Sequence, residues 1–324
     1  MFNWRKRGLV FKPQDMTGRP WMREFAQAPA TLIFDDYVRV YFACRPLPDQ
    51  NRQYVSRTGY VDLDRKNLLR ILRVSEEPVL PLGECGTFDE FGTYPLSVIR
   101  RDDAVMAYYG GWTRCESTPY NVAIGVAVSQ DGGETFTRLG PGPVLSYSLD
   151  EPTTISGPKI RRFGNRWMLF YVAGTKWIRS EGRVENVFKL RVAHSDDGLR
   201  WSRSGKDLVG SKLEENECQA SPDVIFWKNR YHLFFSYKYS TNFRNNDRGY
   251  RIGYAWSDDL ATWHRDDDQA GIDIAREGFD DESIAYPHVF ELDGQLYMFY
   301  LGNEVGRYGF GLAELEDYTP GGRP

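Results

Sequence analysis

Pro158-Lys-Ile-Arg-Arg-Phe-Gly-Asn-Arg-Trp-Met-Leu-Phe-Tyr171 combines a proline that enters a strand, a tight turn and a second apolar strand that ends in aromatic residues. The same pattern occurs five times. Its prolines, which are 66, 63, 64 and 65 residues apart, are Pro29, Pro95, Pro158, Pro222 and Pro287. Its aromatic pairs are Tyr41-Phe42, Tyr108-Tyr109, Phe170-Tyr171, Phe234-Phe235 and Phe299-Tyr300. A repeat of this length with several short strands is typical of small sheets arranged around an axis.

A second phrase predicts the end of the third strand in three of the repeats. It occurs as Val126-Ala-Val-Ser-Gln-Asp-Gly132, Val192-Ala-His-Ser-Asp-Asp-Gly198 and Tyr254-Ala-Trp-Ser-Asp-Asp-Leu260. Asn, Asp and Gly between β-rich runs indicate tight turns, because these residues tolerate positive φ. A fourth strand is expected after each of these turns.

The last repeat lacks room for a fourth strand, because only residues 314–324 follow Phe310-Gly-Leu-Ala313. We expect residues 8–11 to supply the missing outer strand and so close the ring, which would remove open sheet edges. The sequence therefore predicts an all-β protein. Residues 1–324 would form a single five-bladed β-propeller domain of four-stranded antiparallel blades that begin near the five prolines. A β-sandwich is the alternative, but no repeat of about 64 residues is expected in that fold.

Composition narrows the possible functions. The net charge of −4 gives no reason to expect a nucleic acid or a membrane surface as partner. No segment reaches the roughly 20 apolar residues of a membrane span, and the first residues lack the core of a signal peptide. A cytoplasmic location is therefore predicted. Cys44, Cys85, Cys115 and Cys218 show no metal-binding spacing and are interpreted as free thiols, and neither a metal nor a cofactor is expected. The oligomeric state stays open.

Acidic residues occur at one position of the repeat. Five residues before the successive prolines stand Glu24, Glu90, Thr153, Glu217 and Glu282, and Asp89 precedes Glu90. In a propeller the first strand of each blade lines the axis, so these residues are expected to converge on one end of it. Carboxylates brought together in this way would shift one another's pKa values and could act as an acid and a base. The alternative is that a duplicated surface glutamate was copied without a function.

Cations and aromatic residues are expected at the same end of the axis, where the second strands finish. These residues are Arg45, Trp112, Lys176, Trp177, Lys238 and Tyr239. Aromatic faces stack on sugars, and cations hold phosphate or carboxylate groups. His288, directly after Pro287, falls on an inner strand and is a further candidate for binding substrate. The alternative is that the tryptophans pack between blades and that His288 is a core histidine.

Three phrases carry a resemblance to a known superfamily. They are Gly86-Thr-Phe-Asp-Glu-Phe-Gly-Thr-Tyr-Pro95, Val192-Ala-His-Ser-Asp-Asp-Gly-Leu-Arg-Trp201 and Glu217-Cys-Gln-Ala-Ser-Pro-Asp-Val-Ile225. Over nearly its whole length the chain resembles the five-bladed propellers of arabinanases, levansucrases, invertases and mannoside phosphorylases, which belong to glycoside hydrolase families 43, 68, 32 and 130. This resemblance implies a carbohydrate-active enzyme that cleaves a glycosidic bond, for example in a polysaccharide, with a pair of carboxylates.

The chain departs from this superfamily at the usual catalytic positions. Where arabinanase-type enzymes place two aspartates and a glutamate, it has Ala28, Tyr94 and Ser156. The Glu217-Cys218 pair resembles the phrase that carries the invertase-type acid, so Glu217 is the predicted general acid. Glu90, with Asp89 beside it, is the predicted base or nucleophile. Glu282 is predicted to tune charge in the catalytic group, and Glu24 to tune charge or bind sugar hydroxyls.

Two other functions remain open. Arg45, Lys176 and Lys238 suit phosphate, so the substrate could be a sugar phosphate and the reaction phosphorolysis or glycosyl transfer. The missing acids also allow a propeller that binds a glycan without cleaving it.

Overall fold

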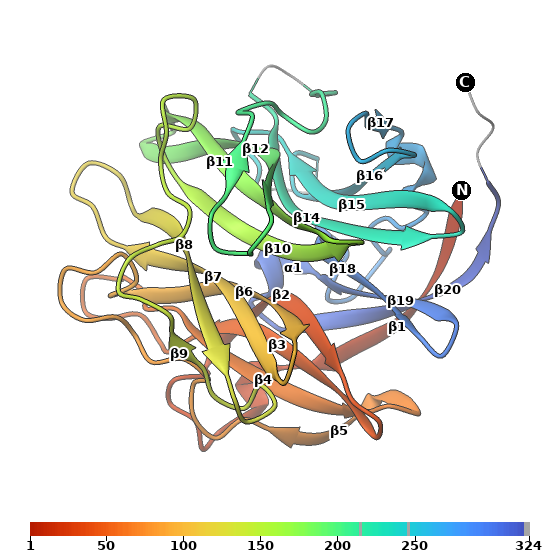
Figure 1. The fold of residues 1–324 in the computed structure, drawn as a ribbon, viewed down its shortest axis with the longest axis horizontal. Coiled ribbons are helices and arrows are strands. Elements are labelled where there is room, and N and C mark those ends of the chain that lie inside the picture. Colours follow the sequence, from red (N-terminus) through yellow and green to blue (C-terminus); the bar gives the residue numbers. More distant parts are fainter. Residues whose placement is uncertain (214–215, 245–246, 321–324) are drawn as a thin grey trace.

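The computed structural model describes residues 1–213, 216–244 and 247–320, and it confirms the predicted all-β fold. Within these residues, five four-stranded antiparallel sheets are arranged around a common centre (Figure 1). The last four residues of the predicted domain, 321–324, lie outside the described residues. No helix in the described part of the chain is long and apolar enough to cross a membrane.

Each blade begins with its inner strand, and the five inner strands contain the five prolines. Blade 1 consists of β2 (Glu24–Ile33), β3 (Tyr37–Arg45), β4 (Arg57–Asp64) and β5 (Asn67–Val74). Blade 2 consists of β6 (Gly92–Arg101), β7 (Ala104–Thr113), β8 (Asn121–Ser129) and β9 (Thr137–Arg138). Blade 3 consists of β10 (Ile155–Phe163), β11 (Arg166–Ser180), β12 (Arg183–Ser195) and β13 (Ser202–Arg203). Blade 4 consists of β14 (Cys218–Trp227), β15 (Arg230–Lys238), β16 (Arg251–Ser257) and β17 (His264–Arg265).

Blade 5 combines the two ends of the described chain. It consists of β18 (Ala285–Leu292), β19 (Gln295–Leu301), β20 (Phe310–Tyr318) and, as its outermost strand, β1 (Phe2–Phe11). Three short helical segments complete the fold: η1 (Pro13–Asp15), η2 (Asp267–Ala270) and α1 (Asn303–Gly306). The prediction that residues 8–11 close the ring is confirmed, and the closing strand is longer than predicted.

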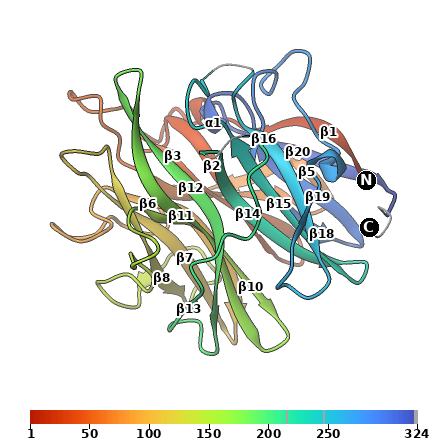
Figure 2. The same ribbon diagram turned by 90° about the horizontal axis from the view of Figure 1, so that it is seen from above.

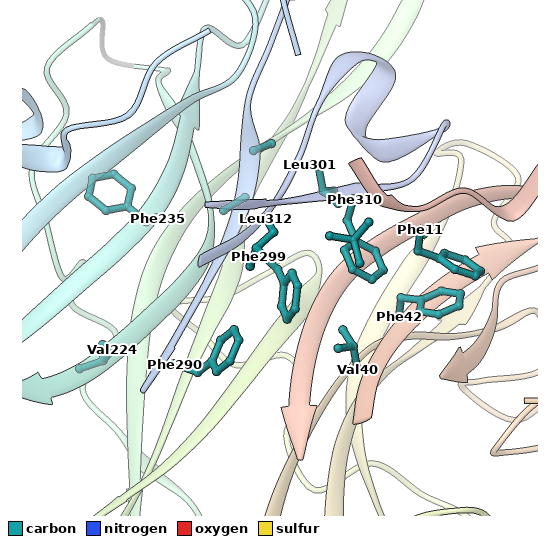
Figure 3. Packing of buried hydrophobic residues seen from close by; sticks show 14 of the residues in the cluster. Phe11, Val40, Phe42, Val224, Phe235, Phe290, Phe299, Leu301, Phe310 and Leu312 are labelled. Carbon is teal, nitrogen blue, oxygen red and sulfur yellow. The ribbon is translucent and has the colours of Figure 1, made fainter. Parts of the chain in front are cut away.

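Aromatic packing joins blade 5 to blade 1 at the end of β1. The ring of Phe11 lies 4.7 Å from that of Phe42 in blade 1 and 5.9 Å from that of Phe310 in blade 5, measured between centroids. Figure 3 shows these three rings next to one another, with Phe299 close by. All four side chains are fully buried, so they form one continuous apolar contact across the seam of the ring.

The predicted Ser-x-Asp turns are closed by their own side chains. In blade 2 the Asp131 carboxylate accepts the backbone N–H groups of Glu134 and Thr135 at 2.9 and 3.0 Å. Asp197 and Asp259 accept backbone N–H groups in the same way in blades 3 and 4. Burial would raise the pKa of Asp131, but hydrogen bonds from the Ser129 and Thr135 hydroxyls, followed by these backbone N–H groups, lower it to about 2.

The axis itself is narrow. The five prolines line a central cavity of about 20 Å³, which is room for about one water molecule. Leu96 and Lys159, which follow the prolines of blades 2 and 3, also line this cavity. Lys159 lies beside Asp223 and His288, which follow the prolines of blades 4 and 5. The His288 Nδ1 donates to Asp223 Oδ2 at 2.6 Å, and Lys159 Nζ lies 3.3 Å from the same oxygen.

This axial group ties four blades together. Arg161 of blade 3 is bonded to the other oxygen of Asp223. The backbone N–H of Thr31, in blade 1, donates to His288 Nε2 at 3.0 Å. Burial lowers the pKa of His288 to about 4, with a further lowering by the Lys159 cation, so the ring is neutral at pH 7. These contacts favour the core-histidine alternative for His288.

Candidate functional site

The start of each inner strand and the end of each second strand meet at one end of the axis. We call this end the mouth and define it by four tyrosines and two cations: Tyr94, Tyr120, Tyr250, Tyr286, Arg45 and Lys238. Tyr94 and Tyr286 directly precede axial prolines, and the Tyr94 hydroxyl donates to the Tyr286 hydroxyl at 3.2 Å. The Tyr286 ring lies 6.1 Å from the Tyr250 ring. Burial raises the pKa of all four tyrosines, which therefore stay protonated and able to donate hydrogen bonds.

Aromatic side chains continue from the mouth across blades 2 and 3. The Tyr120 ring lies between Trp112 and Trp177, at 5.8 and 5.4 Å, and meets both edge to face. Trp177 stands on the hairpin of β11 and β12, whose strands have 15 and 13 residues and are the longest of the described strands. Figure 2 shows this green hairpin reaching past the neighbouring strands on one face of the ring. The tryptophans thus form one wall of the mouth.

Arg45 ends β3 and lies among aromatic rings on the blade 1 side of the mouth. Its guanidinium carbon is 4.3 Å from the Phe25 ring centroid, 5.3 Å from that of Trp112 and 5.9 Å from that of Tyr94. Its NH2 group donates to Gln27 Oε1 at 3.0 Å, while its Nε has no hydrogen-bond partner among the described residues. Glu24 acts on Arg45 only electrostatically, since its ion-pair partner is Arg307, and no ion pair joins Arg45 to a carboxylate among the described residues.

Lys238 ends β15 on the blade 4 side of the mouth, and its residue is only 4% exposed. Its ammonium lies 3.1 Å from the centroid of the Phe243 ring, 5.4 Å from that of Tyr250 and 5.7 Å from that of Phe188. Its one hydrogen bond to a described residue goes to the backbone oxygen of Tyr239 at 3.3 Å. Burial lowers the pKa of Lys238 to about 8, against the opposing effect of Cys218 and Glu185.

Two carboxylates border this aromatic region. Glu24, at the start of β2, accepts the Tyr54 hydroxyl and the Arg307 guanidinium, each at 2.6 Å. Burial opposes its ionisation, but these two hydrogen bonds outweigh burial and lower the pKa of Glu24. Glu185, on β12, pairs with Arg244 at 2.7 Å and acts electrostatically on Tyr120 and Lys238.

Asp89 and Glu217 belong to a repeated buried arrangement that ties the start of a blade to its outer strand. In blade 2, Asp89 accepts the Tyr109 hydroxyl at 2.9 Å and the Arg138 Nε at 2.7 Å. The same pattern of acid, second-strand tyrosine and basic residue recurs as Glu151, Tyr171 and Arg203 in blade 3 and as Asp280, Tyr300 and Lys6 in blade 5.

In blade 4 the acid is Glu217. It is fully buried, pairs with Arg265 of β17 at 2.6 Å and accepts Gln219 Nε2 at 2.9 Å. Burial alone would raise the pKa of this carboxyl, but Arg265 and Gln219 hold it below its ordinary value. A general acid must instead carry a proton near neutral pH. These contacts favour a structural role, and the catalytic role of Glu217 stays a prediction.

The other predicted acids stand apart from the mouth cations. Glu90 is partly exposed and accepts the backbone N–H of Gly86 at 2.9 Å. Glu282 is exposed; its backbone N–H donates to Asn303 Oδ1 at 2.9 Å, and its backbone oxygen accepts Arg251 NH1 at 3.2 Å. Repulsion between neighbouring acids was expected to raise the pKa values of these glutamates. Hydrogen bonds from Tyr54 and Arg307 instead lower the pKa of Glu24 against burial, and those from Arg265 and Gln219 lower the pKa of Glu217.

The remaining predicted residues lie around the rim. Lys176 is exposed next to Trp177, and Tyr239 lies under Arg248, whose guanidinium carbon is 3.8 Å from the ring centroid. Among the described residues, no group of three or more His, Cys, Asp or Glu side chains could hold a metal ion.

Tyr120, Tyr250 and Glu185 were not singled out by the sequence. Tyr120 and Tyr250 directly precede the third strands of their blades, and Glu185 lies near the tip of a hairpin. One signal in the sequence could have indicated Glu185. The segment between Tyr171 and Val192 is longer than the corresponding segments of the other repeats, which is typical of a protruding hairpin.

A more open hollow of about 360 Å³ lies at the opposite end of blade 2, beside the β6–β7 turn. Its lining includes Arg101, Asp102, Asp103 and Leu139 and contains no aromatic side chain. A hollow without aromatic faces offers no stacking platform for a sugar, so the mouth is the better candidate site.

Comparison with solved structures finds the fold of this chain in several proteins described as glycoside hydrolases or mannoside phosphorylases. A structure described as "Glycoside hydrolase" superposes with a TM-score of 0.73 and 19% identity, covering 98% of this chain and 92% of that one. A thermostable family-43 glycoside hydrolase gives a TM-score of 0.61 at 15% identity, with 93% and 96% covered. A member of the GH130 family of mannoside phosphorylases, which contains glycoside hydrolases that target beta-1,2 mannosidic linkages in Candida mannan, gives 0.68 at 14% identity, with 97% and 94% covered. The predicted resemblance in fold is therefore confirmed.

Sequence comparison finds closer relatives. No family model matches the chain. "Uncharacterized protein MT1551" of Mycobacterium tuberculosis strain CDC 1551 / Oshkosh is 32% identical over 315 residues, which is 97% of this chain and 99% of the relative. "Uncharacterized protein Rv1502" of Mycobacterium tuberculosis strain ATCC 25618 / H37Rv matches to the same extent. With its whole propeller aligned to these relatives, the chain belongs to the family of MT1551 and Rv1502.

Proposed function

We propose that this protein is a carbohydrate-active enzyme that cleaves a glycosidic bond in the mouth of the propeller. The observation that carries the proposal is the mouth itself, where Trp112, Tyr120 and Trp177 form an aromatic wall beside the carboxylates of Glu24 and Glu185. Aromatic faces stack on sugar rings, and a pair of carboxylates is the usual equipment for cleaving glycosides. The fold that this chain has in common with glycoside hydrolases supports the proposal.

The contacts of the two mouth carboxylates suggest their roles. Glu24 is held ionised by Tyr54 and Arg307, which suits a general base or a nucleophile. Glu185 is the proposed general acid, because its partner Arg244 is exposed and can be displaced by a bound sugar, unlike the buried Arg265 beside Glu217. The freed carboxylate would take up a proton from solvent and pass it to the leaving group. This assignment moves the acid–base pair away from Asp89 and Glu217, which are buried in ion pairs with outer-strand arginines. Glu90 and Glu282 stay predictions as auxiliary groups on the surrounding loops.

A panel of aryl glycosides tests the proposal. Glu185→Gln and Glu24→Gln should each lower kcat by about two to four orders of magnitude and leave the melting temperature close to that of the wild type. Trp177→Ala should mainly raise KM, because it removes stacking area without touching the reacting groups. Glu291→Gln, an exposed change on β18, is the matched control and should keep full activity. Full activity in both mouth variants would refute the assignment of the acid and the base.

Phosphorolysis is the second candidate reaction, and glycosyl transfer from a sugar phosphate is related to it. Arg45 and Lys238 favour it, because phosphate needs fixed positive charge, and so does the fold in common with the GH130 family. Release of a sugar 1-phosphate that depends on added inorganic phosphate would identify phosphorolysis. Product formation that is unaffected by millimolar phosphate would exclude it.

A propeller that binds a glycan without cleaving it is the third candidate. Its support is the occupation of the usual acid positions by Ala28, Tyr94 and Ser156. Binding to immobilised polysaccharides without any product after long incubation would favour this function.

We also propose a cytoplasmic location, which the four free cysteines support because thiols persist in reducing compartments.

A further inference from the structure

Lys238, which is 4% exposed, and Arg45, which is half-buried, have no ion pair among the described residues, unlike most of the strongly buried cations of this protein. Arg39, Lys159 and Arg191 each have a carboxylate partner, namely Asp62, Asp223 and Glu151. Lys189 has none among the described residues, but its ammonium donates short hydrogen bonds to Ser211 Oγ at 2.6 Å and to the backbone oxygen of Glu217 at 2.7 Å. Lys238 is as buried as these residues, yet among the described residues its ammonium forms no ion pair and donates one long hydrogen bond to a backbone oxygen. A buried ammonium without an anionic partner is costly to the folded protein, so its retention needs an explanation.

The acids of the mouth do not neutralise these two cations. Glu185 is bound to Arg244 at 2.7 Å and Glu24 to Arg307 at 2.6 Å. Arg307 also binds Glu304 at 2.9 Å, so it is shared by two carboxylates. None of these acids is an ion-pair partner of Arg45 or Lys238, which lie on either side of the tyrosine cluster. The aromatic rings around both cations favour positive charge but supply no anionic oxygen atoms.

The tyrosines between the two cations are suited to a sugar. From Arg45 the series runs through Tyr94 and Tyr286 to Tyr250 and then to Lys238, through contacts of 3.2 to 6.1 Å. Phenol groups donate hydrogen bonds to hydroxyl oxygens, and their rings cover the apolar face of a sugar. A ligand that spans this series would meet hydroxyl partners in the middle and a cation at each end.

We propose that the mouth selects a sugar that carries its own negative charge, either the carboxylate of a uronic acid or a phosphate ester. This inference rests on the proposed action of the mouth on carbohydrates and specifies the class of sugar. The anionic group would take the place that a carboxylate side chain takes beside the other buried cations. Bidentate contact with a guanidinium and a charge-assisted bond to the ammonium would then fix the orientation of the sugar.

Matched pairs of ligands test the inference by isothermal titration calorimetry. The pairs are the methyl glycosides of glucuronate, galacturonate and mannuronate against those of glucose, galactose and mannose, and glucose 6-phosphate against glucose. The charged member of at least one pair should bind about tenfold to a hundredfold more tightly, as expected for hydrogen bonds to charged groups. Lys238→Met or Arg45→Gln should abolish this difference, whereas Lys66→Met, an exposed change in the β4–β5 turn, should preserve it.

The stability of the variants separates binding from folding. Lys238→Met replaces a buried, unpaired cation by an apolar side chain of similar length, so its melting temperature should equal or exceed that of the wild type. Arg45→Gln tests the other side of the mouth independently, should the first variant not fold.

Each outcome of the titrations has one meaning. If neutral sugars bind as tightly as their charged counterparts and are cleaved, the inference is overturned while the proposed function stands. If charged sugars bind selectively but are never cleaved, the inference stands and the enzymatic proposal fails. If inorganic phosphate binds and increases the affinity for a neutral sugar, the anion is a separate substrate, and the inference is overturned.

Discussion

Equivalent positions of the repeat hold side chains with different tasks. The residue after the axial proline is apolar in blades 1 and 2, as Ala30 and Leu96, but is charged or polar in blades 3, 4 and 5. Lys159, Asp223 and His288 can be buried there because the Asp223 carboxylate accepts the His288 Nδ1–H and pairs with the Lys159 ammonium. A buried polar group is tolerated when it is paired, so these three positions depend on one another.

Glu217→Gln distinguishes a structural from a catalytic glutamate. The change leaves Arg265 buried opposite a neutral amide, and breaking a buried ion pair costs about 3 kcal/mol. We therefore expect a clear fall in the free energy of unfolding, measured in urea, while activity per folded molecule persists. Unchanged stability together with lost turnover would instead establish Glu217 as the general acid. Glu291→Gln, which alters an exposed carboxylate, is the control.

The axial histidine should make stability depend on pH. The pKa of His288 is about 4 in the folded protein, lowered mainly by burial and then by Lys159, against about 6.5 in the unfolded chain. The unfolded chain therefore binds more protons between these values, and stability falls as the pH drops from about 6.5 to about 4. His288 accounts for about 3 kcal/mol of this loss. Asp223, whose pKa is lowered by Arg161 and Lys159 against burial, adds a further loss below pH 4.

Denaturation in urea between pH 4 and pH 8 measures this dependence. His232, whose pKa burial also lowers to about 4, contributes in the same direction. Burial lowers the pKa of His194 as well, which adds to the slope. His288→Asn should therefore remove part of the slope, and His264→Gln, an exposed change on β17, should leave it intact. A slope unchanged by His288→Asn would contradict the assignment.

At the scale of elements, the sequence predicted the inner hairpins better than the site. The turns Arg101-Asp-Asp103 and Leu292-Asp-Gly294 are local signals, so the strands that flank them could be placed directly. The partner of a carboxylate is not a local signal. Glu217 meets Arg265, 48 positions later, only because both strands belong to one blade. The roles of acidic residues were therefore the part of the prediction that depended on tertiary structure.

The residues of the mouth were predicted only in part, because some of them also depend on tertiary structure. Arg45, Trp112 and Lys238 end second strands, and the propeller repeat alone brings such positions to one end of the axis. Tyr120 and Glu185 depend on the path of a loop and on the length of a hairpin, which no repeat pattern specifies. The sequence thus predicted Arg45, Trp112 and Lys238, which the structure places at the mouth, but it did not predict Tyr120 or Glu185 there.

Shortening the β11–β12 hairpin tests its contribution to the site. Replacing residues 178–185 by Asn-Gly would make a two-residue turn of a favoured type and would remove Glu185. The deleted segment is mostly exposed or half-buried, so the melting temperature should change by only a few degrees. Turnover should fall by at least about a hundredfold. Retained turnover would show that neither the hairpin tip nor Glu185 takes part in the reaction.

For the whole molecule, stability depends on the seam where the ring closes. Phe11 is fully buried between blade 5 and blade 1, whereas Leu9 on the same strand is 37% exposed. Phe11→Ala should lower the free energy of unfolding by about 3 to 5 kcal/mol, as expected for a large buried aromatic side chain. Leu9→Ala should cost less than about 1 kcal/mol. Equal effects of the two changes in urea denaturation would mean that the seam contributes little to stability.

The pairing of β1 with β20 also has a consequence for folding kinetics. The backbone N–H of Thr319 donates to the oxygen of Met1 at 3.0 Å, although the two residues are 318 positions apart. Contacts between such distant residues require closure of a very long loop and slow folding. A circular permutant that links residues 319 and 1 by a short glycine-rich segment and opens the chain between blades 1 and 2 would turn this pairing into a local hairpin. That permutant should refold faster than the parent chain while it reaches the same native ring.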